Sequence, residues 1–385
     1  MNYLYICAGT YLFLLLFILP VLVGVLCRQL IKRHMIRFYA VKDPKGIEAL
    51  ESINVGGFNQ WLHIRGRNKE NPILLFVHGG PGLPQIGWFD AMQRPWEDFF
   101  TVVQWDQRQT GKSYASMAAI GDTLTNERMI QDTEEVICHL RDRFDQEKIF
   151  IMGFSYGTYL SMHMVKRHPD WLHAYISLGQ SVNVIRSIEI EYELLLGHAK
   201  ENNDKQLVEK LEAIAPRIDM KDKAGSFLKH SGLIFDELAK IGKGVRRHMS
   251  QKDVMDMITV ERWISPHLTL RDLLNPVIGD GPALGNPNYG FAEEFMDIDL
   301  PAEVGRSFDV PIYLFAGAHD WHIPITQQKE WFDSITAPHK ELVLFEESAH
   351  LAVHKEPGRF LLALVTKVLP IATMDKLAGD DVNAE

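Results

Sequence analysis

The chain has 385 residues, of which 46% are hydrophobic and 23% charged, and its formal net charge is −10. This composition is that of an ordinary globular protein with a substantial core, so disordered and fibrous classes are excluded. The acidic balance provides no basic surface for a phosphate backbone, and we therefore expect no nucleic-acid partner.

The cysteines and histidines give no sign of a metal. Cys7 and Cys27 lie at the two ends of an apolar stretch, which leaves Cys138 alone in the rest of the chain. Three such cysteines form neither a disulfide framework nor a thiolate zinc site. The 16 histidines are scattered, without the HExxH spacing that puts two imidazoles on one helix face. We therefore predict no metal site.

The first segment is strongly apolar. No charged residue occurs in residues 3–27, and such a span exceeds the roughly 20 residues that a helix needs to cross a bilayer. We predict a single-pass transmembrane anchor over residues 1–30. Basic residues follow it, which by the positive-inside rule predicts a membrane protein whose catalytic domain is cytoplasmic; they are Arg28, Lys32, Arg33 and Arg37. A cleaved signal peptide and a merely buried helix are the alternatives, but residues 1–5 carry no basic residue.

After the anchor, short apolar runs alternate with helical patterns. Residues 38–40 and 61–65 are predicted to be short strands on either side of a hairpin at Gly56 and Gly57. Six further runs have the continuous apolar composition of buried parallel strands; they are 72–77, 100–105, 148–152, 174–178, 311–315 and 341–345. An amphipathic helix is predicted at 126–143. This alternation predicts an α/β protein with a mostly parallel central sheet.

The alternation stops over residues 181–305, which are mainly helical in pattern, with Gly and Pro concentrated at 275–290. We predict an inserted helical cap there, between a first core part at 31–180 and a second at 306–370. Such a cap would cover the carboxyl ends of the strands, where open α/β sheets bind ligands. Residues 371–385 are predicted to be a loose acidic tail.

A GxSxG motif, Gly-Phe-Ser-Tyr-Gly at 153–157, stands directly after a predicted strand and before a helical pattern. A sharp turn from strand to helix exposes a serine hydroxyl, and glycines two residues away on either side relieve the crowding. We therefore predict Ser155 to be a catalytic nucleophile.

A glycine-rich segment, His-Gly-Gly-Pro-Gly at 78–82, follows another predicted strand. Glycine lets backbone NH groups approach the oxyanion of a tetrahedral intermediate. We predict the NH groups of Gly80 and Tyr156 as the oxyanion hole. His78 is expected to be a structural hydrogen-bonding residue, and the polar cluster at 106–113 is expected to be architectural.

Asp320 and His350 each lie just beyond the end of a predicted strand. Together with Ser155 they occur in the chain order Ser, Asp, His, in which the imidazole takes the serine proton and the carboxylate orients the imidazole. We predict these three as a catalytic triad. The competing groups are the imidazoles of His319, His322 and His354 and the carboxylates of Glu346 and Glu347.

The motifs together resemble the proline iminopeptidase family of serine peptidases, which has the α/β-hydrolase fold. The resemblance rests on HGGPG at 78–82, DQRxxGxS at 106–113, GFSYG at 153–157, GAHD at 317–320 and SAH at 348–350. It implies an aminopeptidase that needs no cofactor and binds the substrate's free amino group with glutamates of the cap. Glu189, Glu191 and Glu193 are candidates for that role, and Glu189 and Glu193 share a helix face as a predicted carboxylate pair.

The leading hypothesis is thus a membrane-anchored serine hydrolase that releases N-terminal residues, proline among them, from short peptides through an acyl-enzyme intermediate. The first alternative is a carboxylic ester or lipid hydrolase that uses the same triad close to the bilayer. A non-catalytic, membrane-bound interaction protein is the second alternative. The physiological substrate and the oligomeric state stay open.

Overall fold

The computed structural model describes residues 14–114, 124–214, 233–234, 236–238, 240–241, 259–274 and 291–373. Its centre is an eight-stranded sheet in the order β1-β2-β4-β3-β5-β6-β7-β8. The strands are β1 (Ile47–Val55), β2 (Phe58–Gly66), β3 (Ile73–Val77), β4 (Thr101–Asp106), β5 (Ile149–Phe154), β6 (Leu172–Leu178), β7 (Ile312–Gly317) and β8 (Lys340–Phe345). The pairs β1–β2 and β2–β4 are antiparallel and all other pairs are parallel, which confirms the mostly parallel sheet.

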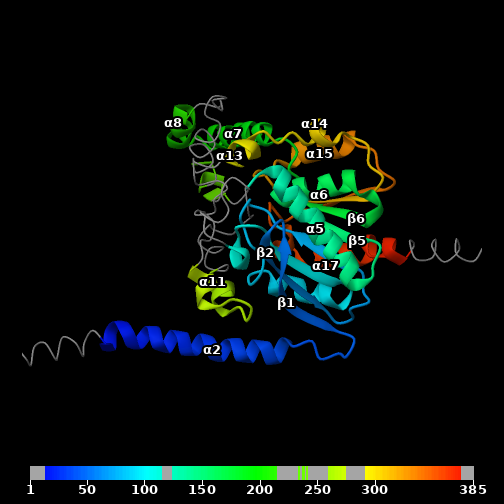
Figure 1. Ribbon diagram of the computed structural model, residues 1–385. Coiled ribbons are helices and arrows are strands. Elements are labelled where there is room, and N and C mark those ends of the chain that lie inside the picture. The colour runs from blue at the N-terminus through cyan, green and yellow to red at the C-terminus, as the bar shows by residue number, and fades with distance from the viewer. Residues whose placement is uncertain are drawn as a thin grey trace, which may run out of the picture.

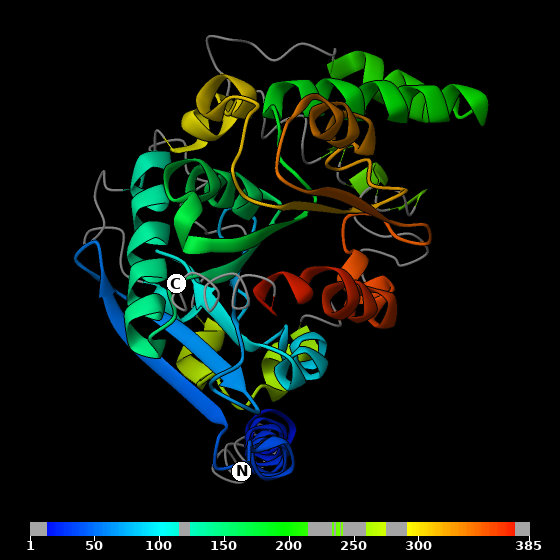
Figure 2. The ribbon, with the colours of Figure 1, turned by 90° about the vertical axis from the view of Figure 1, so that its right-hand side faces the viewer.

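Helices cover both faces of the sheet (Figures 1 and 2). The helices and helical turns are η1 (Leu14–Ile18), α2 (Leu19–Tyr39), α3 (Asp90–Gln93), η2 (Arg94–Asp98), η3 (Gly111–Ser113), α5 (Asn126–Phe144), α6 (Tyr156–Arg167), η5 (Pro169–Trp171), α7 (Val184–Glu201), α8 (Lys205–Ile214), α11 (Leu270–Leu274), α13 (Phe291–Met296), α14 (Leu300–Val304), α15 (Ile325–Ser334), α16 (Ala352–Lys355), α17 (Pro357–Ala363) and η6 (Leu364–Val368). The amphipathic helix predicted at 126–143 is confirmed as α5.

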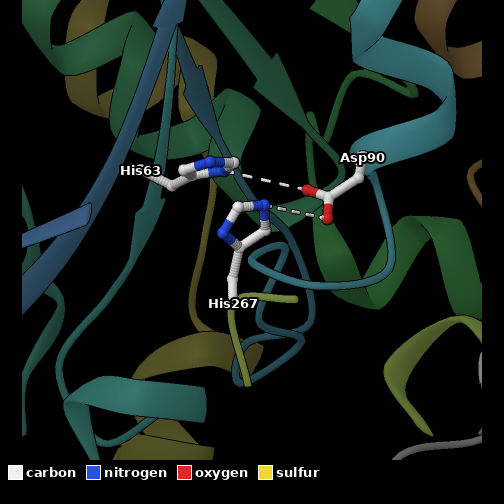
Figure 3. A group of neighbouring side chains, drawn as sticks. All are labelled: His63, Asp90 and His267. Atoms are coloured by element: carbon white, nitrogen blue, oxygen red, sulfur yellow. Dashed lines mark ion pairs between the residues drawn. The ribbon is translucent and has the colours of Figure 1, made fainter. Parts of the chain in front are cut away.

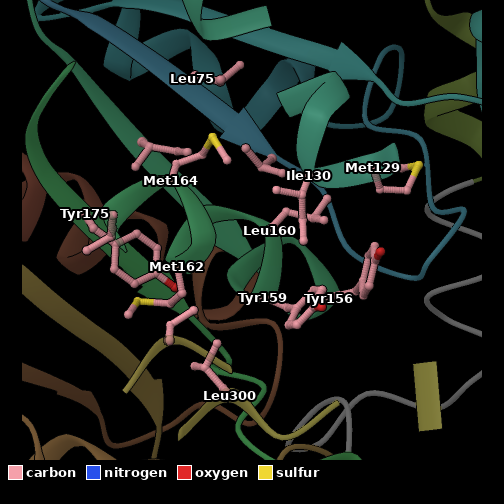
Figure 4. Packing of buried hydrophobic residues seen from close by; sticks show 14 of the residues in the cluster. Leu75, Met129, Ile130, Tyr156, Tyr159, Leu160, Met162, Met164, Tyr175 and Leu300 are labelled. Atoms are coloured by element: carbon pink, nitrogen blue, oxygen red, sulfur yellow. The ribbon is translucent and has the colours of Figure 1, made fainter. Parts of the chain in front are cut away.

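Alternate residues of the central strands belong to two separate cores. On β3, Leu75 packs with α5 and α6, whereas Leu74 and Phe76 pack with η2 and α17 on the other face. Figure 4 shows the first of these cores, in which Leu75 lies among side chains such as Leu160 and Met164 of α6. Since side chains alternate along a strand, a strand buried on both faces must be apolar throughout, as the sequence of β3 is.

The two antiparallel strands at the edge depart from the prediction. Residues 38 and 39 end helix α2 instead of forming a strand, and the hairpin around Gly56 pairs β1 with β2 over nine residues each. The apolar segment at the N-terminus continues as one helix through its basic residues, which favour helix, up to Tyr39. The strand predicted at 38–40 is therefore wrong, and strand β1 was not predicted.

The connection between β6 and β7 is long, and its described parts are mainly helical. It contains α7, α8, α11, α13 and α14. Figure 1 shows α7, α8 and α13 beyond one end of the sheet and α11 near helix α2. Residues 215–232, 242–258 and 275–290 of the predicted cap lie outside the described residues, so its bounds of 181–305 remain a prediction. Of the predicted tail, residues 374–385 lie outside them as well, and residues 371–373 are still helical.

Helix α2 runs along the lower side of the molecule in Figure 1. Residues 15–39 form one helix that is long and apolar enough to cross a membrane, by length and composition only. Arg28 is an exception on this largely exposed helix, because its side chain is only 1% exposed. It donates hydrogen bonds to the carbonyl oxygens of Trp263 at 2.8 Å and Leu268 at 2.7 Å, and the ammonium of Lys32 also donates to Leu268. The helix is thus joined to the segment at 259–274. Residues 1–13 of the predicted anchor lie outside the described residues.

Candidate active site

Ser155 lies in the sharp turn between β5 and α6. Its backbone has φ 52° and ψ −121°, a conformation that costs an L-residue free energy and is typical of strained functional turns. The flanking glycines make the turn possible: a Cβ on Gly153 would lie 2.7 Å from the Gly157 carbonyl oxygen, and one on Gly157 would lie 2.0 Å from that of Val77. The sequence motif therefore forms the strained turn that was predicted.

Asp320 and His350 follow the ends of β7 and β8. The Nδ1 of His350 lies 2.8 Å from Oδ2 of Asp320, and both side chains are buried. The NH of Ile323 donates to Oδ1 of Asp320 at 2.9 Å, which fixes the carboxylate. A carboxylate at Nδ1 holds the proton there and leaves Nε2 free to accept another proton.

The turn after β6 brings the serine and the histidine together. The NH of Ser155 donates to the carbonyl of Leu178 at 2.9 Å, and the next residue, Gly179, packs against His350. The ring of Phe154 lies 4.9 Å from the imidazole of His350. Among the described residues no hydrogen bond joins the Ser155 hydroxyl to His350; such bonds tighten when substrate binds. The Asp–His bond of the predicted triad is therefore formed, and Ser155 is near it through its neighbour Phe154 and through Gly179.

The competing imidazoles have other surroundings. His322 lies 3.2 Å from a carboxylate oxygen of Glu191, and its ring centre is 5.0 Å from that of His350. His354 stacks on Trp88 at 5.2 Å. His350 is the imidazole whose Nδ1 is hydrogen-bonded to Asp320, so it remains the best candidate for the base.

The glycine-rich segment at 78–82 borders the serine. A Cβ on Gly79 would lie 2.7 Å from Cβ of Ser155, so only glycine allows this approach. Gly80 has φ +116° and follows it directly. The NH of Tyr156 is the first of helix α6, a position without an intrahelical acceptor. Of the predicted donors, Tyr156 directly follows Ser155, and Gly80 directly follows Gly79, which packs against Ser155.

His78 and the cluster at 106–113 hold these loops in place. Nε2 of His78 accepts from the NH of Gln107 at 3.1 Å, and its Nδ1 lies 2.9 Å from the carbonyl of Gly79. Burial lowers the pKa of His78 to about 4, so the ring is neutral. Asp106 accepts from the NH groups of Ile86 at 3.1 Å and Lys112 at 2.8 Å. These contacts are those of a structural histidine and an architectural carboxylate.

The predicted carboxylate pair on α7 does not face the triad. Glu189 and Glu193 are 42% and 66% exposed, and both lie near Arg186, at 3.1 and 3.9 Å. The buried carboxylate is that of Glu191, which is 6% exposed and bonded to His322. Residues two apart on a helix point to nearly opposite sides, which is why one glutamate is buried and two are exposed.

A signal for Glu191 was present in the sequence. It belongs to the spacing i, i+3, i+4, i+7 that marks the buried face of a helix; the members are Ile188, Glu191, Tyr192 and Leu195. Burial raises the pKa of the Glu191 carboxyl, while its hydrogen bond to His322 opposes that rise. The pKa of His322 is raised by the hydrogen bond and charge of Glu191, against burial, which lowers it.

Comparison with known proteins agrees with this architecture. Residues 72–357 match the family described as the alpha/beta hydrolase fold. The probable aminopeptidase YbaC of Bacillus subtilis is 28% identical over 320 residues, which are 83% of this chain and 96% of that protein. The resemblance that the motifs indicated is thereby confirmed.

Two solved structures extend the comparison. A proline iminopeptidase-related protein of Thermus thermophilus is similar with a TM-score of 0.61 and 18% identity, covering 84% of this chain and 99% of its own. A bacterial membrane phospholipase A is similar with a TM-score of 0.53 and 14% identity, covering 96% of this chain and 98% of its own. At such identities the likeness concerns the fold. From the match over 72–357, the chain belongs to the family of the alpha/beta hydrolase fold.

Proposed function

We propose that this hydrolase is a serine aminopeptidase that acts on short peptides with a free amino end. The observation that carries the proposal is the buried carboxylate of Glu191 beside the proposed base. Glu191 contacts His322, and the ring centre of His322 lies 5.0 Å from that of His350. A buried carboxylate gains most from a partner that brings positive charge, and the ammonium of a peptide is such a partner.

In this mechanism His350 takes the proton of the Ser155 hydroxyl as the oxygen attacks the substrate carbonyl. Asp320 holds the imidazole in orientation and stabilises the imidazolium that forms. The NH groups of Gly80 and Tyr156 stabilise the oxyanion. The protonated His350 then gives its proton to the leaving amine, and water releases the acyl group in the reverse sequence.

Glu191 would set the register of the substrate. An ammonium bound there lies on the side of His350 that faces His322, so the first peptide bond would be presented to Ser155. A blocked amino end has no charge to pair with Glu191. This supports an enzyme that removes one residue at a time and, in keeping with the resemblance, accepts proline as that residue.

The test compares free and N-acetylated aminoacyl nitroanilides, prolyl derivatives included, with the full-length protein in detergent. We expect turnover of the free forms, and we expect Glu191→Gln to raise KM for them with little change in kcat. Glu189→Gln is the matched control, because it removes an exposed carboxylate from the same helix. Equal turnover of free and blocked substrates would refute the aminopeptidase proposal.

The alternative of an ester or lipid hydrolase rests on the N-terminal helical segment, whose residues 15–39 have the length and composition of a membrane span. Such a helix would keep the domain beside lipid substrates. Turnover of acyl esters alone, without any aminoacyl nitroanilide, would favour it. The non-catalytic alternative fails if a fluorophosphonate labels the protein and Ser155→Ala removes the label.

We also propose that the protein is a single-pass membrane protein with its folded domain on the cytoplasmic side. The support is the order of the apolar residues of α2 and the basic residues that follow, Arg28 to Arg37. Protease digestion of sealed, right-side-out vesicles should leave the domain intact. Its digestion there would reverse the orientation.

A further inference from the structure

Three side chains from distant parts of the sequence meet away from the proposed triad. His63 is on strand β2, Asp90 is the first residue of helix α3, and His267 precedes α11. Their ligand atoms all lie within 4.8 Å of one another. In Figure 3 the two imidazoles and the carboxylate point toward a common centre, each from a different segment.

The nitrogens and oxygens that face this centre have no hydrogen-bond partner among the described residues. This holds for both ring nitrogens of His63, for Nε2 of His267 and for both carboxylate oxygens of Asp90. His63 is fully buried, and the other two side chains are only 10% and 11% exposed. Buried polar atoms are nearly always satisfied, because each unpaired one costs free energy. Their accumulation at one point indicates a ligand that all of them can bind.

The two distances to Asp90 are close to those between metal ligands and are too wide for direct hydrogen bonds. Nδ1 of His63 lies 3.7 Å from Oδ1 of Asp90, and Nε2 of His267 lies 3.4 Å from Oδ2. A direct N–H···O bond would be about 2.7–3.2 Å long. Ligands placed about 2.0–2.1 Å from a tetrahedral zinc ion lie about 3.3 Å from one another. We propose that His63, Asp90 and His267 bind one divalent transition-metal ion of the zinc type.

The donor set suits such an ion. Two imidazoles and one carboxylate are ligands that zinc prefers over calcium or magnesium, which favour oxygen donors. Histidine binds zinc as the neutral imidazole and aspartate as the ionised carboxylate, and both can occupy one tetrahedral site.

The basic groups close enough to act on the cluster are Arg65, Arg94 and Lys32. Arg65 is close enough to affect the pKa of His63, but its guanidinium is paired with Glu97 at 2.9 Å and with Glu48. Arg94 stacks over the ring of Tyr39 at 3.5 Å. Glu261 adds a further carboxylate close enough to Asp90 to interact with its charge.

A metal at this point would join three parts of the protein. His63 belongs to the central sheet, Asp90 to the connection that follows the glycine-rich segment, and His267 to the long insertion. The same part of the insertion already accepts a hydrogen bond from Lys112 at the His267 carbonyl, at 3.2 Å, and two from Arg28. The ion would therefore fix residues 263–272 between the sheet and helix α2.

The experiment uses the full-length protein in detergent after removal of metals with a chelator. Zn²⁺ is titrated by calorimetry, and Co²⁺ is added separately because its visible spectrum reports tetrahedral coordination. We expect one equivalent of Zn²⁺ to bind and to raise the melting temperature, and we expect an intense Co²⁺ spectrum. Mg²⁺ and Ca²⁺ should give neither effect.

The variants His267→Ala and Asp90→Asn should weaken Zn²⁺ binding by roughly tenfold or more and remove the thermal shift. His267 lies on the insertion and not in the sheet, so its variant tests the site even if a change at His63 prevents folding. His139→Ala is the matched control, since His139 forms a partly exposed pair with Glu51 at 3.7 Å. No stoichiometric binding, or binding unchanged in His267→Ala, would overturn the proposal.

Discussion

Gly179 offers a test of the proposed base in which no proposed catalytic residue is replaced. A Cβ on this residue would lie 2.6 Å from Cε1 and 2.8 Å from Nδ1 of His350. Because carbon atoms in contact are about 3.5 Å apart or more, the ring in Gly179→Ala must move by about 0.9 Å. The bond from His350 to Asp320, now 2.8 Å, would then leave hydrogen-bonding range.

Misplacement of a catalytic group by about 1 Å can lower the rate about 100-fold, so we expect kcat of Gly179→Ala to fall by about that factor with KM little changed. The backbone strain of alanine at the positive φ of +68° adds a stability loss of about 1–2 kcal/mol. Gly57→Ala is the control: Gly57 has φ +80° and no atom near its Cβ position, so it bears the strain without the collision. Both variants are assayed for nitroanilide and ester turnover and for thermal unfolding. A kcat close to that of the wild type in a folded Gly179→Ala would refute the role of His350.

Three further changes test other parts of the structure. In Asp132→Ala, the guanidinium of Arg108, which is 1% exposed, loses the carboxylate that lies 2.8 Å from it. The free energy of unfolding, measured by denaturant titration, should fall by about 3–5 kcal/mol. An unchanged denaturation midpoint would contradict this. Burial raises the pKa of Glu191, so the preference for free over blocked amino ends should decline as the pH falls through that raised pKa, and Glu191→Gln should show no such decline. Ser155→Ala should abolish fluorophosphonate labelling while the melting temperature stays near that of the wild type; persistent labelling would place the nucleophile elsewhere.

The parts of the fold that could be predicted are those whose sequence signal is local. The run at 72–77 is apolar throughout because β3 is covered on both faces, and the GxSxG motif marks its own strand and helix. Strand β1 was missed because its alternating residues, with charges at Glu48 and Glu51, have no continuous apolar run. Its position depends on pairing with β2, which local composition does not encode.

The site residues could be predicted only where they belong to a recognisable sequence motif. Glu189 and Glu193 lie on the exposed side of α7. The sequence could not indicate this, because a shared helix face does not say which face is buried, and that depends on what packs against α7. The group of His63, Asp90 and His267 has no spacing signal at all, since the three residues come from different segments. Only the folded chain brings them together, which is why the sequence predicted no metal.

The contact of Arg28 with the insertion has a consequence for how the domain would stand on a bilayer. Arg28 lies 11 residues before the end of α2 at Tyr39, so at 1.5 Å per residue about 16 Å of this helix is alongside the folded domain. If α2 crosses a bilayer, no flexible linker separates the folded domain from the membrane-spanning part of the helix. The helix itself would set the distance and the tilt of the folded domain relative to the bilayer, so the active site would face the membrane at a fixed angle.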